Sequence, residues 1–594
     1  MKKNNGRIQW KEWSRTVTPL RIEAWGKYLA LGIYWTAFAA LLVLMLQKCR
    51  YGYVSPDEGF YLVTPYRFIQ GDRMLLDEWH FSQFASFTMI PEVWLYLKLA
   101  GTTESMLLNF RYLYTLFWSM ASAFLYFRCR TIQKNGARLA SLFMMCYAPY
   151  GIMAFSYNSL GILYLVNAAI FLLCARRHQR LQFFVSGVFF AGAVLCCPYL
   201  AAIYLFYSFR LGICLIRKKK RAMIINGQDA LTCWKYFTLG VCVLSVLFLR
   251  ALCAGTSPGL LLSSLSEALQ DEEHPAFSVT VKVISYFQGL WQSNDLFLPC
   301  VGIILAMTGL NLYHKNAAWL CIASGAIVVY LRRFMQVQPY INLLMLPMTL
   351  IGVYVLFATR QRKIREVGIY WLLPGILYTF CIHCSSNQGI LAVSSAATVS
   401  SAAAFLMLGM YCDELSGIST REKKERKQYL TAWAAVLACF LFQMRYEVPM
   451  RWQTVFQEPG LMQYEDKMTV DRGSQKGIIA TVRNAERYQE LFHDLEGITH
   501  QPVLFLSGQT WMYLENGNQP ATFSAWLGSI NNGWDKTVSD TTIKRLRSYY
   551  AARKKLPTMI LTEKDNLPFV INLFSEINLS TTQLNETDWL IRLQ

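Results

Sequence analysis

Long segments without a charged residue recur throughout the chain. The sequence repeatedly runs 17 to 20 residues from one charge to the next, and 54% of its 594 residues are hydrophobic. A helix needs about 20 mostly apolar residues to cross the hydrocarbon core of a bilayer, and this chain is too apolar for an ordinary soluble protein. The sequence therefore predicts an α-helical polytopic membrane protein.

About thirteen transmembrane helices are predicted from these segments. They lie at residues 28–47, 108–127, 139–156, 159–175, 182–197, 199–216, 235–253, 296–313, 317–331, 339–359, 367–383, 391–411 and 429–445. Lys and Arg cluster in alternate loops, at 128–138, 176–180, 217–221, 360–365 and 421–427. Because cytoplasmic loops are rich in Lys and Arg, we expect these loops and the N-terminus in the cytoplasm. An odd number of crossings then places the C-terminus on the outer face of the cell membrane.

This topology divides the chain into three parts. Residues 1–27 form a cytoplasmic segment, residues 28–445 a transmembrane domain with a first outer loop at 48–107, and residues 446–594 an extracytoplasmic domain. Residues 182–216 have to be split into a hairpin around Pro198, because a single crossing would move the last three basic loops outside.

The last 145 or so residues alternate two patterns. Apolar residues recur at helical spacing from Val482 to Leu495, while Val503–Leu506 and Met559–Leu561 are short apolar runs bounded by turn residues. We predict a small C-terminal α/β domain.

Charge and cysteine content exclude several classes of protein. The formal net charge is +20, but the cations lie in short runs between apolar segments, so no nucleic-acid partner is predicted. Nearly all of the 16 Cys lie in or beside apolar segments and none follows Cys439, which indicates packing residues rather than disulfides. No set of ligands stands at metal-site spacing. We predict neither a metal nor another cofactor.

The first outer loop begins with a helix-start signal, Ser55-Pro56-Asp57-Glu58. Ser at the N-cap, Pro at the first helical position and Glu at the third are typical of a capping box. Asp57 and Glu58 then have two interpretations. They cap the helix and complement its dipole, or Asp57 accepts a proton in a partly dry site where its basicity rises.

A second acidic cluster, Asp77-Glu78-Trp79-His80, follows in the same loop. His80 beside two acids is compatible with a metal site, but further ligands are missing at suitable spacing, so a hydrogen-bonding role is favoured. Apolar residues at helical spacing from Phe81 to Trp94 predict one amphipathic helix on the bilayer surface.

The loop resembles the first outer loop of the multi-spanning GT-C glycosyltransferases, in particular the branch of protein O-mannosyltransferases and lipid A aminoarabinose transferases. The similar pattern consists of Pro56-Asp57-Glu58-Gly59-Phe60-Tyr61, Gly71-Asp72, Asp77-Glu78, Pro91, Leu95-Tyr96, Gly101 and Arg111. It covers residues 50–115. One departure is His80-Phe81-Ser82-Gln83-Phe84, where many relatives have a Pro-Pro step, which puts the preference for donor or acceptor in doubt.

The resemblance implies particular roles. Asp57 would be the catalytic base, while Glu58, Asp77 and Glu78 would shape the acceptor site, with His80 beside them. The donor would be a polyprenyl-phosphate sugar, and the acceptor a lipid, a glycan or a protein. Independently of the resemblance, nucleotide sugars are not supplied outside the cytoplasm, so a lipid-borne donor is the one available there.

Arg332 and Arg333 are predicted on the outer face, against the positive-inside trend. Guanidinium groups at headgroup depth can form bidentate bonds to the phosphate that leaves during transfer. Alternatively, the two residues anchor a helix end to lipid headgroups.

The function predicted from these observations is that of an inverting membrane glycosyltransferase. Two other classes stay open, a transporter or flippase for envelope lipids and a non-catalytic envelope scaffold. Transporters usually carry ionisable residues at mid-membrane, and the predicted spans here carry almost none.

Overall fold

The computed structural model describes residues 5–52, 56–80, 82–146, 149–175, 177–216, 224–225, 228–269, 279–292, 345–386, 389–417, 454–455, 458–459, 466–506, 508–527 and 540–594. Three predicted apolar segments, 296–313, 317–331 and 429–445, lie outside these ranges, as do Arg332 and Arg333.

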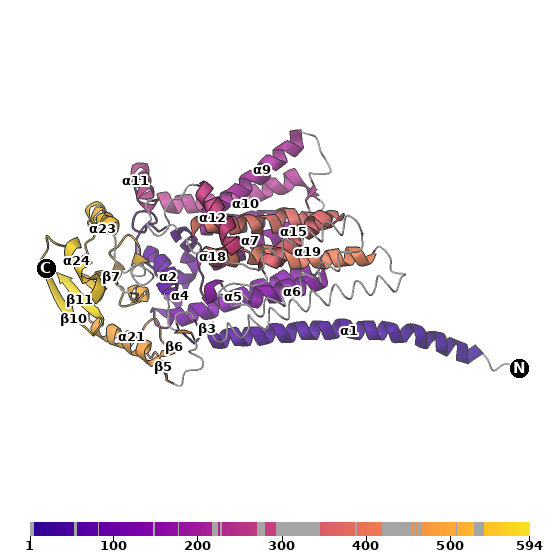
Figure 1. The fold of residues 1–594 in the computed structure, drawn as a ribbon, viewed down its shortest axis with the longest axis horizontal. Helices are drawn as coiled ribbons and strands as arrows, with labels where there is room; N and C mark the ends of the chain where they lie inside the picture. Colours follow the sequence, from indigo (N-terminus) through magenta and orange to yellow (C-terminus); the bar gives the residue numbers. More distant parts are fainter. Residues whose placement is uncertain are drawn as a thin grey trace.

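The chain is mostly helical, and its helices run alongside one another in a bundle (Figure 1). The N-terminus lies at one end of the molecule and the C-terminus in a sheet at the other. Four described helical stretches are long and apolar enough to cross a membrane: Tyr28–Lys48, Gln179–Cys196, Ala230–Cys253 and Arg362–Ser385. Tyr157–Leu173 and Met348–Ala358 are shorter apolar stretches. Together with the hydrophobic composition, these helices make the chain a membrane protein.

The bundle consists of long and short helical elements. The long ones are α1 (Asn5–Lys48), α5 (Met106–Cys129), α6 (Lys134–Cys146), α7 (Tyr157–Leu173), α8 (Gln179–Cys196), α9 (Ala201–Ile216), α10 (Ala230–Cys253), α12 (Val279–Gln292), α15 (Met345–Ala358), α17 (Leu373–Ser385) and α19 (Thr398–Gly417). Shorter elements are η1 (Pro149–Gly151), η2 (Pro198–Leu200), α11 (Pro258–Ala268), α16 (Arg362–Val367), η5 (Gly368–Leu372) and α18 (Ile390–Ala396). Two-residue strands pair as β1 (Ile224–Ile225) with β2 (Gln228–Asp229) and β3 (Thr454–Val455) with β4 (Glu458–Pro459).

Proline positions decide where two of these helices end. The expected break at Pro198 is present, since α8 ends at Cys196 and α9 begins at Ala201 after the short turn η2. The predicted segment 139–156 extends too far, because α6 starts at Lys134 and ends at Cys146. The short 3-10 turn at Pro149 follows, and Gly151 has a φ of +74°, which an α-helix cannot accommodate.

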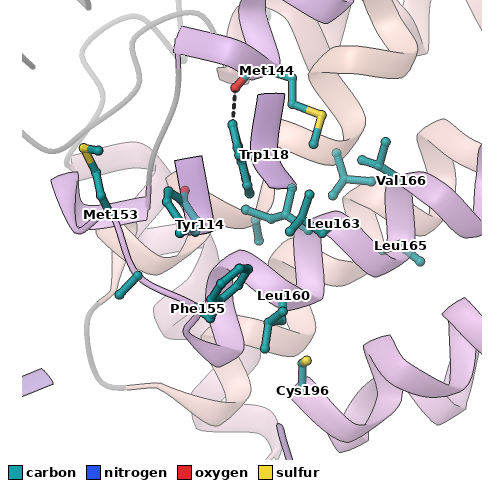
Figure 2. Packing of buried hydrophobic residues seen from close by; sticks show 14 of the residues in the cluster. Tyr114, Trp118, Met144, Met153, Phe155, Leu160, Leu163, Leu165, Val166 and Cys196 are labelled. Atoms are coloured by element: carbon teal, nitrogen blue, oxygen red, sulfur yellow. Dashed lines mark hydrogen bonds between the residues drawn. The ribbon is translucent and has the colours of Figure 1, made fainter. Parts of the chain in front are cut away.

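The bundle core is built from large buried side chains. Trp118 of α5 is completely buried, and its Nε1 donates a hydrogen bond to the Met144 carbonyl oxygen of α6 at 2.7 Å (Figure 2). Tyr114 stacks on Trp118 one turn away and meets the edge of Phe155. A buried indole N–H needs such a partner, so this bond ties α5 to α6 at one register.

Helices α8 and α10 approach most closely at two glycines. A Cβ added at Gly187 would overlap the carbonyl oxygen of Phe237, and one added at Gly240 would overlap that of Phe184. Small residues at matched positions let helix backbones touch inside a membrane.

Gly187→Ala should therefore loosen the bundle. Relieving the overlap with backbone forces α8 and α10 apart, and overpacking of this kind costs about 1 to 3 kcal/mol. Thermal unfolding of the purified protein in detergent measures the loss. Gly212→Ala on α9 is the control, because a Cβ there meets nothing within 4 Å. Equal melting temperatures for the two variants would contradict the close approach.

The first outer loop carries three helices. They are α2 (Pro56–Ile69), α3 (Gln83–Ser86) and α4 (Ile90–Ala100). The single amphipathic helix predicted from Phe81 to Trp94 is wrong, because α3 lasts one turn and a new helix starts beside Pro91. Proline lacks an amide hydrogen and is favoured in the first turn of a helix, so it begins α4 rather than continuing α3.

Residues 466–594, called the C-terminal region below, combine a sheet with helices. The five-stranded sheet has the order β10 (Leu579–Gln583), β11 (Asp588–Leu593), β9 (Met559–Glu563), β7 (Pro502–Leu506) and β8 (Gln519–Pro520). Strand β7 pairs parallel with β8 and β9, while β11 pairs antiparallel with β9 and β10. The other elements are the β5 (Lys467–Thr469) and β6 (Ile479–Thr481) hairpin, α21 (Val482–Asp494), η7 (Thr510–Leu514), α23 (Asp540–Arg553), η8 (Lys564–Asn566) and α24 (Leu567–Leu573).

The bundle, the outer loop and the C-terminal region share one hydrophobic core. A single cluster of buried side chains runs from Tyr34 of α1 through Phe60 of α2 to Trp511 of η7. The C-terminal region is thus packed directly on the loop that begins at α2.

Candidate active site

Asp57 stands in the first turn of α2 and is half-buried. Its carboxylate has no hydrogen bond or ion pair with any residue in the described ranges. Burial, reinforced by the negative charge of Glu58, raises the pKa of Asp57 to about 7. Near neutral pH such a carboxyl group is divided between its two forms, which suits a group that has to accept a proton and release it again.

Glu58, the next residue, is held in a different way. Its carboxylate accepts two hydrogen bonds from Arg111 of α5, from Nε at 2.5 Å and from Nη2 at 2.6 Å. Both side chains are buried. Arg111 also donates to the carbonyl oxygens of Cys49 at 3.0 Å and Tyr51 at 3.3 Å. The pair therefore fixes the start of α2 to the bundle, whereas Asp57 has no arginine partner among the residues that the structure describes.

Glu78 and Asp77 bind cations of the loop and of the C-terminal region. Glu78 is fully buried and accepts from Arg67 Nη1 at 2.7 Å and from the backbone N–H of Ala525 at 3.2 Å. Asp77 accepts from Arg553 Nε of α23 at 2.8 Å. Both acids thus join the first outer loop to the C-terminal region.

Asp72 adds a third link of the same kind. It accepts from Arg67 Nε at 2.8 Å and from Lys555 Nζ at 2.8 Å. Burial acts to raise the pKa of Asp72, but the charges of Arg67 and Lys555 outweigh it and lower the pKa below its ordinary value. Arg67 itself is fully buried and also donates to the carbonyl oxygens of Asp77 and Thr522.

His80 contacts Phe60 of α2. Phe60 follows Asp57 by three residues, about one turn of the helix. The ring of His80 meets Phe60 edge to face at 5.2 Å between centroids, and the half-buried Trp526 lies 6.2 Å away. Its Nδ1 is 2.6 Å from Ser82 Oγ. Phe60 thus contacts both His80 and Trp526. Among the aromatic residues of the C-terminal region, Trp511 and Tyr513 are buried in the core instead.

Gly59 allows α2 to touch η7. A Cβ at this position would lie 2.8 Å from the backbone nitrogen of Trp511, so only glycine fits without a shift of backbone. Sequence reasoning did not foresee this contact, nor the role of Arg67. The sequence signal for the contact of α2 with η7 is Gly59 itself, because a glycine inside a helical pattern often marks a close approach of two backbones.

No group of three or more His, Cys, Asp or Glu side chains that could hold a metal ion occurs within the part of the chain that the structure describes. Arg332 and Arg333, predicted to bind the donor phosphate, lie outside that part.

The chain is similar to several solved structures at low sequence identity. No protein-family model and no curated protein matches the chain. Among solved structures, it is similar to ArnT from Cupriavidus metallidurans in the apo state, with 10% identity and a TM-score of 0.46. The same ArnT bound to undecaprenyl phosphate has 12% identity and a TM-score of 0.43. In both cases the similarity covers 95% of this chain and 98% of the other.

A third similar structure is the archaeal oligosaccharyltransferase AglB from Archaeoglobus fulgidus in complex with an inhibitory peptide and a dolichol-phosphate. Its identity is 12% and its TM-score 0.44, over 90% of this chain and 69% of that one. Similarity at this level assigns no function, and the chemistry rests on the side chains of the chain itself.

Replacing Arg67, whose guanidinium group joins the first outer loop to the C-terminal region, should destabilise the protein strongly. Arg67→Met leaves Glu78 buried without its ion-pair partner, a change that costs about 3 to 5 kcal/mol in comparable pairs. Thermal unfolding and protease sensitivity of the C-terminal region measure it. Arg73→Ala is the matched control, because the Arg73 guanidinium makes an exposed bond to Gly255. If Arg67→Met melts like this control, the buried pair does not hold the two parts together.

Proposed function

We propose that the chain is a membrane glycosyltransferase that moves a sugar from a polyprenyl-phosphate carrier to an acceptor hydroxyl on the outer face. The observation that carries the proposal is Asp57, a carboxylate with raised pKa and no described bonding partner, at the boundary between the apolar bundle and the C-terminal region. The resemblance of residues 50–115 to the first outer loop of GT-C glycosyltransferases supports it.

Asp57 acts as the general base in this proposal. It takes the proton of the acceptor hydroxyl while the acceptor oxygen forms a bond to the anomeric carbon of the sugar. The bond between that carbon and the phosphate oxygen breaks, and the polyprenyl phosphate leaves with the electron pair. Attack from the face opposite the leaving group inverts the anomeric centre.

The other polar residues have supporting roles. Glu58 keeps Arg111 neutralised, so the start of α2 keeps its place while Asp57 changes its protonation. His80 and Trp526, which both contact Phe60 of α2, offer a polar and an aromatic group that suit the hydroxyls and the apolar face of a sugar. Asp77 and Glu78 shape this acceptor side indirectly, through the C-terminal region that they bind. Arg332 and Arg333 remain the proposed cations for the leaving phosphate on the evidence of the sequence.

Asp57→Asn tests the base. Asparagine keeps the size of the side chain but cannot take a proton, so turnover should fall by about a hundredfold or more while the protein stays folded. The assay measures sugar transfer by purified protein supplied with a pool of polyprenyl-phosphate sugars, alongside thermal unfolding.

Glu58→Gln is the matched comparison at the neighbouring residue. It leaves the buried Arg111 without its ion-pair partner, so its first effect should be a lower melting temperature. Wild-type turnover in Asp57→Asn would rule out this mechanism and return the scaffold class to consideration.

The rate should also depend on pH in a defined direction. Because the pKa of Asp57 is raised to about 7, its basic form is lost as the pH falls below neutral. We expect kcat/KM to rise with pH and to reach half of its plateau near pH 7, rather than near 4 as for an exposed Asp.

Glu515 provides the control for this profile, because burial raises its pKa to about 7 as well. It accepts hydrogen bonds from Ser474 N at 2.8 Å and Tyr488 OH at 3.1 Å within the C-terminal region. Glu515→Gln should leave the midpoint of the profile unchanged. A profile that is flat from pH 5 to 8, or that flattens only in Glu515→Gln, would contradict the role of Asp57.

A further inference from the structure

The carboxyl group of Glu515 is buried where the C-terminal region meets the helical bundle, and the proposed sugar transfer does not use it. Glu515 directly follows η7 and is 3% exposed. Its Oε1 accepts hydrogen bonds from the backbone N–H of Ser474 at 2.8 Å and from the Tyr488 hydroxyl at 3.1 Å. The carboxyl group thereby ties η7 to α21 and to residues 470–478 between β5 and β6, called the hairpin loop below.

The hairpin loop in turn holds the beginning of α5. The strands β5 and β6 lie beside α21 at the side of the C-terminal region that faces the bundle (Figure 1). The carbonyl oxygen of Gly473 accepts a hydrogen bond from Ser105 N at 2.9 Å, and that of Ser474 accepts one from Leu107 N at 3.1 Å. The first N–H groups of a helix lack partners within the helix, and the Ser105 side chain does not cap α5. The hairpin loop therefore supplies two of the missing acceptors.

The hairpin loop has little room to adjust around Glu515. Gly473 has a φ of +67°, a conformation that suits glycine, and a Cβ at this position would overlap the Tyr488 hydroxyl. Ser474 bonds to Glu515 through its N–H and to α5 through its carbonyl oxygen. Movement of the Glu515 carboxyl group is thus passed on to the start of α5, one turn before Arg111.

The groups around Glu515 do not neutralise its charge. They are Glu104 just before α5, Arg472 and Lys476 of the hairpin loop, Tyr488 of α21 and Tyr66 of α2. Lys476 pairs with Glu104 at 2.8 Å, and the two phenols are uncharged near neutral pH. Burial outweighs the hydrogen bonds from Ser474 and Tyr488 and raises the pKa of Glu515 to about 7.

We infer that Glu515 makes the attachment of the C-terminal region to the start of α5 sensitive to pH, with the tightest attachment in acid. When the hairpin loop opens, the carboxyl group reaches water and its pKa returns to the ordinary 4.5, whereas the closed form keeps its proton up to about pH 7. The open form therefore gains on the closed form as the pH rises from 4.5 to about 7, and the gain is complete above that range.

This sensitivity is independent of the proposed sugar transfer. The open form stays a minor fraction of the protein, so the midpoint of the kcat/KM profile still reports Asp57. The C-terminal region is predicted on the outer face of the membrane, where the pH follows that of the surroundings. Acid surroundings would then strengthen the contact between the C-terminal region and the bundle.

Hydrogen exchange of the full-length protein in detergent tests the inference. The exchange of residues 103–110 and 470–478 is followed by mass spectrometry and corrected for the intrinsic rate at each pH. We expect protection of both segments to fall by about tenfold or more between pH 5 and pH 7.5 and then to level off. Helix α19 is the internal reference and should keep its protection.

Three variants assign the effect to one carboxyl group. Glu515→Gln cannot titrate, so the fall in protection should disappear. Tyr488→Phe removes a hydrogen bond that favours the charged carboxylate, so the levelling off should move to higher pH. Asp57→Asn is the control, because burial also raises the pKa of Asp57 to about 7, and it should keep the full dependence. If Glu515→Gln does not fold, Tyr488→Phe and Asp57→Asn still decide.

Four outcomes would overturn the inference. Constant protection of both segments from pH 5 to 8 in the wild type would remove the pH dependence itself. A fall in Glu515→Gln that equals the fall in the wild type, or an unchanged profile in Tyr488→Phe, would remove the role of Glu515. Loss of the dependence in Asp57→Asn would assign it to that residue. An equal fall in α19 would show that the whole protein opens, rather than the hairpin loop.

Discussion

The buried ion pair between Glu58 and Arg111 is the constraint on which the candidate site depends. Two adjacent carboxylates at a helix start would repel each other and would both favour solvent. Because Arg111 neutralises Glu58 with two short bonds, Asp57 is the one carboxylate of this turn without a partner among the described residues. The identical charges of Asp57 and Glu58 thereby stand in different surroundings.

Pairs of arginine and carboxylate groups recur at the C-terminal end of α2. There Arg67 gathers Asp72 and Glu78, and a pair of cations from α23 and its C-terminal end, Arg553 and Lys555, completes the cluster. Helix α2 is thus held by arginine and carboxylate pairs at both ends, with the bundle on one side and the C-terminal region on the other. A carboxylate on a helix that is fixed in this way keeps its orientation, as the proposed general base requires.

The sequence predicted helices where a local pattern determines them. The boundaries of α5, α8 and α10 lie close to those of the predicted apolar segments. The helical spacing of apolar residues also predicted α21. The prediction of helices failed where a proline overrides the pattern of apolar residues. Pro149 follows the end of α6, and Pro91 lies in the first turn of α4. The start of a helix at Pro56 and Asp57 was also predicted, and α2 begins there. The partners of Asp77 and Asp72 were not, because Arg553 and Lys555 lie 476 and 483 residues further along the chain, and no local pattern carries information over such a separation.

The contact between Gly59 and Trp511 has a consequence for biosynthesis. Helix α2 leaves the ribosome early, whereas η7 is made some 450 residues later. At a translation rate of about 5 to 20 residues per second, the surface of α2 that η7 covers waits tens of seconds for its partner. During that interval the aromatic face around Phe60 and the cation of Arg67 have no native cover from the C-terminal region. The first outer loop is thus completed last, when η7 packs onto α2, and a ribosome that stops early releases a protein in which α2 lacks this cover.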